Sequence, residues 1–158
     1  MKCFLLGMAC ILALTFITTT EGTDRKPIKP SEKDKCPVCG MFVAKYPDFL
    51  AQVIYQDRSY VVFDGAKDLF KYLLNTGAYG ARPASGIAAM YVTDYYALTP
   101  IDAKRAWYVL GSDVYGPMGR ELIPFAKQPE AQEFLKDHKG TRLLRFEEVT
   151  IEVLKGLE

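Results

Sequence analysis

The first part of the chain has the residue pattern of a β-hairpin. Residues from Phe49 to Tyr55 and from Ser59 to Phe63 are rich in β-branched and aromatic side chains, and the polar residues 56–58 separate the two runs. Such side chains are favoured on a pleated, half-buried surface, and a short polar segment between two such runs is typical of a turn. We therefore expect two antiparallel strands here.

The segment that follows has the period of an amphipathic helix. Its apolar residues recur at positions i, i+3, i+4, i+7 and i+8, which places them on one stripe of a helix over residues 65–75. We expect Asp64 to cap the N-terminus of this helix and Gly77 to follow its end. The stripe consists of Ala66, Leu69, Phe70, Leu73 and Leu74.

The same order of elements then occurs a second time. Strand-like runs precede a turn that contains Gly116, Pro117 and Gly119. Further on, Pro129 lies in the first turn of a predicted helix and Gly140 follows its end. The expected strands are 89–98, 104–110, 121–125 and 141–149, residues 99–102 divide the first two, and the second helix spans 129–139.

This repetition predicts an α+β fold built from two related ββαβ-type halves. The halves span about residues 36–98 and 99–158. Helices that each carry one apolar stripe must bury it, and short strands joined by turns form antiparallel sheet. We therefore expect the helices to pack on largely antiparallel sheet.

The N-terminal part of the chain differs from the rest. Residues 1–22 contain a nearly uncharged apolar run after Met1-Lys2, which is typical of an export signal. The run is also long enough to act as an uncleaved membrane anchor. Residues 23–35 are charged, contain two prolines and lack apolar periodicity, so they are predicted to form a flexible tether. The folded domain is then 36–158.

Composition and charge exclude several classes of protein. The 158 residues are 49% hydrophobic and 25% charged, which is typical of a soluble globular domain. Twenty basic and nineteen acidic residues give a net charge of +1, and neither sign forms a block. Nothing here attracts nucleic acid or anionic lipid, so a membrane contact is expected only through the N-terminal segment.

One short motif carries three soft donors. Cys36 and Cys39 form a C-x-x-C motif, and Met41 follows two residues later. Thiolate and thioether ligands favour Cu(I), whereas thioether is uncommon for zinc. Two other interpretations stay open: a disulfide staple or zinc half-site in a non-catalytic adaptor, and a thiol–disulfide oxidoreductase. Redox-active pairs usually lie where a strand runs into a helix, whereas a charged segment precedes Cys36.

Two further side chains are candidate ligands in the second half. Met118 lies between Pro117 and Gly119 on the predicted turn, where an exposed thioether suits a metal. His138 is the only histidine, and it shares the stripe of the second helix with Ala131 and Phe134, so it is either a packed or capping residue or a ligand. The sequence contains no carboxylate pair spaced for acid–base work, no phosphate loop and no serine-nucleophile motif. We therefore expect a binding protein and not an enzyme.

These motifs together resemble those of a known family. The motifs are Cys36-Pro37-Val38-Cys39-Gly40-Met41, Tyr115-Gly116-Pro117-Met118-Gly119 followed by Leu122 and Pro124-Phe125, and Ala131, Phe134, His138 and Gly140 before Leu144-Arg145-Phe146. The combination resembles the NosL family of nitrous oxide reductase accessory proteins. The resemblance covers nearly all of residues 36–150.

The resemblance implies a fold, a function and a set of partners. It implies a periplasmic, commonly lipid-anchored Cu(I) metallochaperone of two related halves, distantly similar in fold to organomercurial lyase. Such proteins deliver copper to nitrous oxide reductase, an enzyme of denitrification, with the help of a membrane maturation complex. The chain departs from the family pattern in lacking a cysteine suited to lipidation at the end of its signal. The donor pool that the resemblance implies is Cys36, Cys39, Met41, Met118 and His138.

Overall fold

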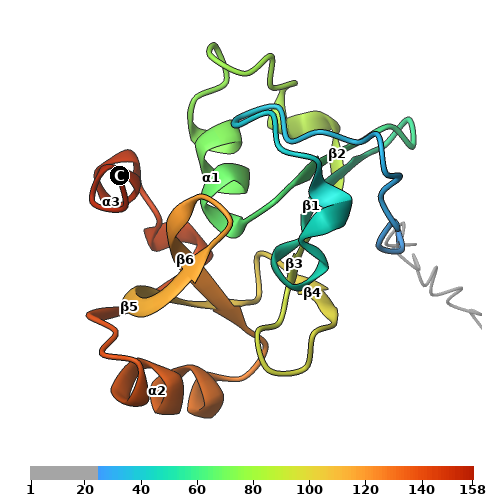
Figure 1. Cartoon of the computed structure of the whole chain (residues 1–158). Coiled ribbons are helices and arrows are strands. Elements are labelled where there is room, and N and C mark those ends of the chain that lie inside the picture. The colour runs from blue at the N-terminus through green and yellow to red at the C-terminus, as the bar shows by residue number, and fades with distance from the viewer. Residues whose placement is uncertain (1–24) are drawn as a thin grey trace, which may run out of the picture.

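The described part of the chain forms two antiparallel sheets. The computed structural model describes residues 25–158, so the predicted export signal lies outside the described residues (Figure 1). One sheet has the strand order β2-β1-β3-β4 and the other the order β6-β5-β7. The strands are β1 (Ala51–Tyr55), β2 (Tyr60–Phe63), β3 (Ile87–Thr93), β4 (Pro100–Asp102), β5 (Trp107–Gly116), β6 (Gly119–Phe125) and β7 (Arg142–Arg145).

Each sheet repeats the same connection. The first strand of a hairpin is central, and it pairs on one side with its hairpin partner and on the other with the strand that follows the helix. In the first half this helix is α1 (Ala66–Leu74), and in the second it is α2 (Gln128–Asp137). The structure therefore confirms the α+β class with two related ββαβ units.

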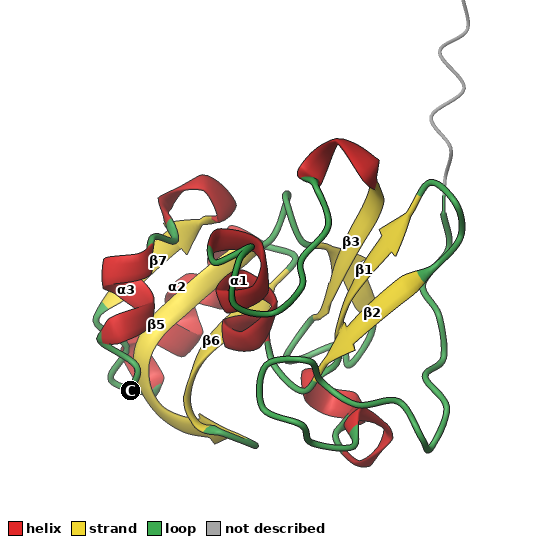
Figure 2. Cartoon of the chain, turned by 90° about the horizontal axis from the view of Figure 1, so that it is seen from above, coloured by secondary structure: helices red, strands yellow, loops and turns green. Residues whose placement is uncertain are grey.

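Helix α1 lies between the two sheets, as Figure 2 shows, and contacts β1, β2 and β6. Its predicted stripe is buried at Ala66, Leu69 and Phe70, but Lys67 and Asp68 in the first turn are buried as well. Because α1 contacts both sheets, no side of its first turn is exposed to solvent. The N-terminal end of α1 is therefore a place where polar side chains must find partners inside the protein.

Two hydrophobic clusters hold the halves. The larger one surrounds α1 and includes Tyr55, Phe63 and Tyr108, while the smaller one lies under α2 and includes Phe125 and Phe134. Burial of each such side chain contributes roughly 1.5–3 kcal/mol, so both helices are fixed by packing more than by helix propensity.

Several strand boundaries differ from the prediction. The strand expected over 89–98 ends at Thr93, and a turn follows in which the side chain of Asp94 accepts the backbone N–H groups of Tyr96 and Ala97. Residues 100–102, expected to divide two strands, are themselves the edge strand β4, which pairs with β3. Proline at position 100 is compatible with an edge strand. The next strand begins at Trp107 and not at 104, because buried Ala103 and Ala106 lie in the turn before it.

The C-terminal segment contains a helix that the pattern did not predict. Strand β7 ends at Arg145, a 3₁₀ turn follows over Phe146–Glu148, and helix α3 spans Ile151–Lys155. Thr150 caps this helix by accepting the backbone N–H of Val153. Helix α3 packs against α1 and so covers part of the first half.

Residues 23–35 were predicted to form a flexible tether, and its flexibility stays a prediction, although the described residues 25–35 bond to the fold at two places. The backbone of Ile28 forms two hydrogen bonds of 2.8 Å with the side-chain amide of Gln52, and Arg25 donates to the carbonyl of Gln56. Ile28 and its neighbouring prolines line a pocket together with Leu50. Composition indicated a linker, but it could not show that a buried glutamine satisfies this backbone.

The described residues include no helix long and apolar enough to cross a bilayer.

Candidate metal centre

The C-x-x-C motif forms a tight turn. The N–H of Cys36 donates to the carbonyl of Met41 at 2.9 Å, and the N–H of Gly40 donates to the carbonyl of Cys36 at 2.9 Å. Gly40 has a φ of 79°, a left-handed conformation that glycine adopts without strain. The backbone amides of Val38 and Cys39 lower the pKa of the Cys36 thiol, and that of Met41 lowers the pKa of the Cys39 thiol, each against the larger effect of burial. The turn thus favours the thiolate form of both residues to some extent.

Two carboxylates from the start of α1 meet these thiols. Cys39 donates its S–H to Oδ1 of Asp64 at 3.0 Å, and Cys36 donates to Oδ2 of Asp68 at 3.2 Å. One ligand atom from each of the four residues lies within 4.8 Å of the others. The prediction that Asp64 caps α1 is wrong: Gly65 occupies the cap position and no side chain caps the helix, because the carboxylate of Asp64 faces the thiol instead.

Burial keeps both thiols protonated at neutral pH. Burial raises the pKa of Cys36, and the negative charge of Asp68 raises it further. Burial, followed by the hydrogen bond to Asp64, raises the pKa of Cys39 to about 12. Burial likewise raises the pKa of Asp68, against the opposing effect of its thiol hydrogen bonds. The backbone N–H groups reduce these shifts but do not reverse them.

One oxygen of the cluster has an open bonding position. Oδ2 of Asp64 is buried and, within the described residues, has no hydrogen-bond partner. A buried carboxylate oxygen without a partner is costly unless a proton or a cation occupies the position. Together with two thiols that become ligands on losing their protons, this oxygen makes the donor set suited to a metal ion.

Met118 reaches the same place from the second half. It lies at the tip of the β5–β6 hairpin, where Gly116 pairs with Gly119, and its side chain is 45% exposed. Met118, Cys39 and Asp68 line one pocket. The expectation of an exposed methionine on a turn is confirmed, and Cys39 from one half and Met118 from the other line the same pocket.

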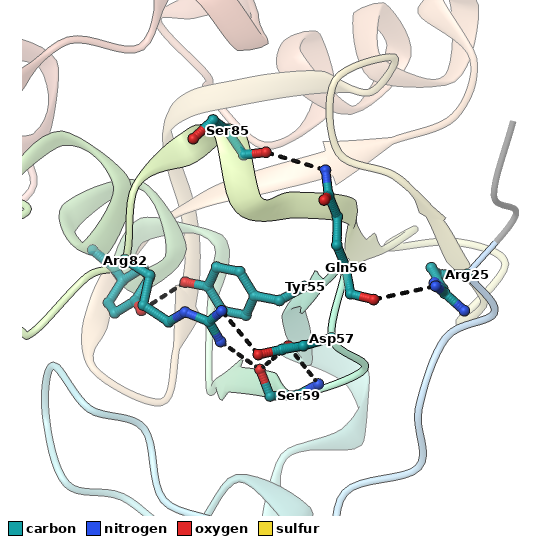
Figure 3. A network of polar contacts seen from close by, with 8 residues as sticks. Arg25, Tyr55, Gln56, Asp57, Ser59, Arg82 and Ser85 are labelled. Atoms are coloured by element: carbon teal, nitrogen blue, oxygen red, sulfur yellow. Dashed lines mark hydrogen bonds and ion pairs between the residues drawn. The ribbon is translucent and has the colours of Figure 1, made fainter.

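The loop between α1 and β3 forms one wall of this pocket and is held by side-chain hydrogen bonds. Tyr79, in the loop between α1 and β3, lines the pocket. Arg82 of the same loop bonds to Asp57 at 2.9 Å and to Ser59 at 2.6 Å, and Figure 3 shows this network against the ring of Tyr55. The loop is thereby fixed to the β1–β2 turn, which holds the wall in place.

Two residues of the predicted donor pool lie elsewhere. His138 follows the end of α2, with its Nδ1 3.1 Å from Asp113 and its ring stacked on Phe134, and it does not line the pocket. Met41 is half-buried and contributes backbone groups to the cysteine turn, but its side chain is not among those that line the pocket. Metal binding by either side chain stays a prediction.

Sequence reasoning missed the two carboxylates. Asp64 was interpreted as a helix cap, and Asp68 was not singled out. The available signal was their separation by four residues at the start of a helix, which places two side chains on one face. Lys67, which lies between them and is buried, was not recognised either. A helix turn that is enclosed by two sheets cannot be identified from local periodicity.

These features define an α+β domain in which a cluster of two thiols and two carboxylates adjoins a pocket lined by Cys39, Asp68 and Met118. A domain of this kind is a candidate metal-binding protein. The family model described as NosL matches residues 27–154, and the chain belongs to the NosL family.

Two similar proteins also carry the name NosL. The chain is 29% identical over 134 residues to the copper-binding lipoprotein NosL of Stutzerimonas stutzeri; the match covers 78% of this chain and 66% of that protein. It is 28% identical to the copper chaperone NosL of Shewanella denitrificans, whose crystal structure has a TM-score of 0.63 and is matched over 80% of this chain and 99% of that one. The chain thus spans about two thirds of the curated relative and nearly all of the solved domain.

Proposed function

We propose that this protein is a Cu(I) carrier that binds one ion through the thiolates of Cys36 and Cys39 and the thioether of Met118. The observation that carries the proposal is that Cys39 and Met118, from the two halves of the fold, line one pocket, and that Cys36 shares a cluster of possible ligand atoms with Cys39. Soft sulfur ligands select Cu(I), and the relatives named above are a copper-binding protein and a copper chaperone. Met41 and His138 remain outside this proposed set.

Asp64 and Asp68 have a supporting part in this proposal. Cu(I) replaces the S–H protons, and the two carboxylates already accept those protons as hydrogen bonds. They are therefore the nearest bases when copper enters and the nearest proton donors when it leaves. A site that can take its protons back favours release to an acceptor as well as capture.

The raised thiol pKa values argue against a thiol–disulfide oxidoreductase. A redox-active pair needs a stabilised thiolate, usually with a lowered pKa, at a partly exposed position. Here burial raises the pKa of both thiols, and carboxylates rather than cations face them. A carrier tolerates protonated thiols because the metal itself displaces the protons.

Uptake of one Cu(I) per chain by the reduced protein, measured against a chromophoric Cu(I) chelator, tests the proposal. Met118→Ala is expected to weaken the affinity roughly 10- to 100-fold, the loss typical when a metal site loses one supporting group. Tyr115→Ala is the matched control, because Tyr115 lies on the same hairpin, is 60% exposed and does not line the pocket. Failure of the wild type to compete for Cu(I) would reject the carrier. A site of two thiols and two carboxylates, which suits Zn(II), would be indifferent to Met118→Ala.

The Cu(I) affinity is expected to rise with pH. Both thiols are protonated near neutrality because burial raises their pKa, that of Cys39 to about 12, so binding must release protons. Between about pH 6 and 8 the slope of log affinity against pH should approach two, less any proton that the carboxylates retain. Met118→Ala should leave the slope unchanged, since a thioether carries no proton. A flat profile would show that copper binding releases no net proton, which would contradict this expectation.

The proposed place and partner follow from the family. We propose that the protein is exported to the periplasm, is held at the membrane through its N-terminal segment, and delivers copper to nitrous oxide reductase with a membrane maturation complex. The description of one relative as a lipoprotein supports the location. Restoration of copper to the metal-free reductase by the loaded protein, without transfer through free ions, would test the partner.

A further inference from the structure

A buried lysine joins the two halves next to the pocket. Lys67, in the first turn of α1, is only 3% exposed. Its Nζ donates to the carbonyl of Met118 at 2.8 Å and to the carbonyl of Arg120 at 2.7 Å. A side chain from the first half therefore bonds directly to the backbone of the hairpin tip that carries the thioether.

A buried carboxylate completes this junction from the other side. Oε1 of Glu121 accepts the backbone N–H of Lys67 at 2.6 Å and that of Leu122 at 2.9 Å. Two glycines leave space for the carboxylate: a Cβ at Gly65 would lie 2.0 Å from Oε2, and one at Gly116 would lie 3.1 Å from Cγ of Glu121. Strand β6 and helix α1 are thus locked together by a matched pair of contacts.

Stability alone does not account for such a junction. A buried charge contributes little net stability even when it is hydrogen-bonded, because the cost of removing it from water offsets the bonds that it makes. What the Lys67 ammonium supplies is geometry, since it bonds to the carbonyl of Met118 at the hairpin tip and to that of Arg120 just after it. Without these bonds the tip would be a two-residue turn with an exposed side chain, the kind of segment that opens most easily.

We infer that Lys67, supported by Glu121, is a positioning residue that holds the thioether of Met118 at the distance from Cys39 that a shared ion requires. The inference rests on the proposed function in one respect, the binding of copper by Met118. It adds that a residue which never contacts the ion sets the affinity by fixing one half of the fold against the other.

The test is a double-mutant cycle measured by Cu(I) competition. Lys67→Leu is expected to weaken Cu(I) binding about tenfold in the wild-type background, as loss of a group that orients a metal ligand does. Leucine removes the ammonium without adding a sulfur donor to the pocket that Lys67 lines. In a Met118→Ala background the same substitution should change the affinity less than twofold. X-ray absorption should show one sulfur neighbour fewer in Lys67→Leu than in the wild type. Lys71→Leu is the matched control: Lys71 is on the same helix, lines the same pocket and bonds to Glu158 rather than to the hairpin.

The outcomes separate the inference from the proposed function. An equal loss from Lys67→Leu in both backgrounds, or an equal loss from Lys71→Leu, would show an effect of charge or folding and overturn the inference. Wild-type uptake of Cu(I) that is indifferent to Met118→Ala would also overturn it while leaving a carrier based on the thiols alone. If Lys67→Leu does not fold, Lys67→Arg keeps the cation and donors in altered geometry, and its loss should again vanish in the Met118→Ala background.

Discussion

Replacement of Cys39 by Ser is expected to weaken Cu(I) binding by more than about 100-fold, since even an orienting group costs up to that much when it is lost from a metal site. The hydroxyl of Ser can still donate to Asp64, as the thiol does at 3.0 Å, so the turn and the start of α1 should keep their structure. A serine hydroxyl, however, is a poor ligand for a soft ion. The affinity is measured by competition with a chromophoric chelator, as for the wild type.

Cys39 is the better position for this experiment than Cys36. Cys36 is 1% exposed and belongs to the larger hydrophobic cluster, so its replacement changes packing as well as ligation. Cys39 is half-buried and faces the pocket. An unchanged thermal midpoint with lost copper binding is the expected pair of results for Cys39→Ser. Retention of Cu(I) binding within a few-fold of the wild type would remove this thiol from the site.

Gly65→Ala is expected to have the largest effect on stability. Its added Cβ would lie 2.0 Å from Oε2 of Glu121, a buried carboxylate whose other oxygen is held by two backbone N–H groups. The clash must move either the carboxylate or the start of α1, at a cost of roughly 2–4 kcal/mol in the free energy of unfolding, from overpacking and loss of buried hydrogen bonds.

A second glycine provides the control for this substitution. Gly77, just beyond α1, is exposed, and a Cβ there would meet nothing within 4 Å. Gly77→Ala should therefore be neutral or slightly stabilising, because it only restricts the unfolded chain. Chemical denaturation of the two variants beside the wild type measures the difference. Equal stabilities would show that the Glu121 junction yields easily, and that α1 is held in some other way.

The parts of the fold that follow from local pattern were predictable. The β1–β2 hairpin and both helices appear where apolar periodicity places them, and the Gly116–Gly119 turn follows from its own residues. Two donors, Cys39 and Met118, were recognisable because soft side chains on glycine-bounded turns are unusual. What brings them together is a contact between halves that no short stretch of sequence encodes.

The polar interior of the site was not predictable for the same reason. Glu121 and Lys67 are fifty-four positions apart, and each appears on its own as a surface residue. Asp68 likewise becomes a partner of Cys36 only because α1 is enclosed on several sides. The hydrogen bonding of the Ile28 backbone depends on a single glutamine in β1, which composition cannot identify as its partner.

The sulfur donors differ steeply in their access to solvent. Cys36 is 1% exposed, Cys39 is half-buried and Met118 is 45% exposed. An ion held by all three would be accessible to a competing ligand only from the side of Met118. The thiolate of Cys36, which is the most buried donor, would then be the last to dissociate. If copper is bound as proposed, an acceptor would have to approach over the hairpin tip and bind the ion before Cys36 releases it, so that copper would pass between the two proteins without entering bulk water.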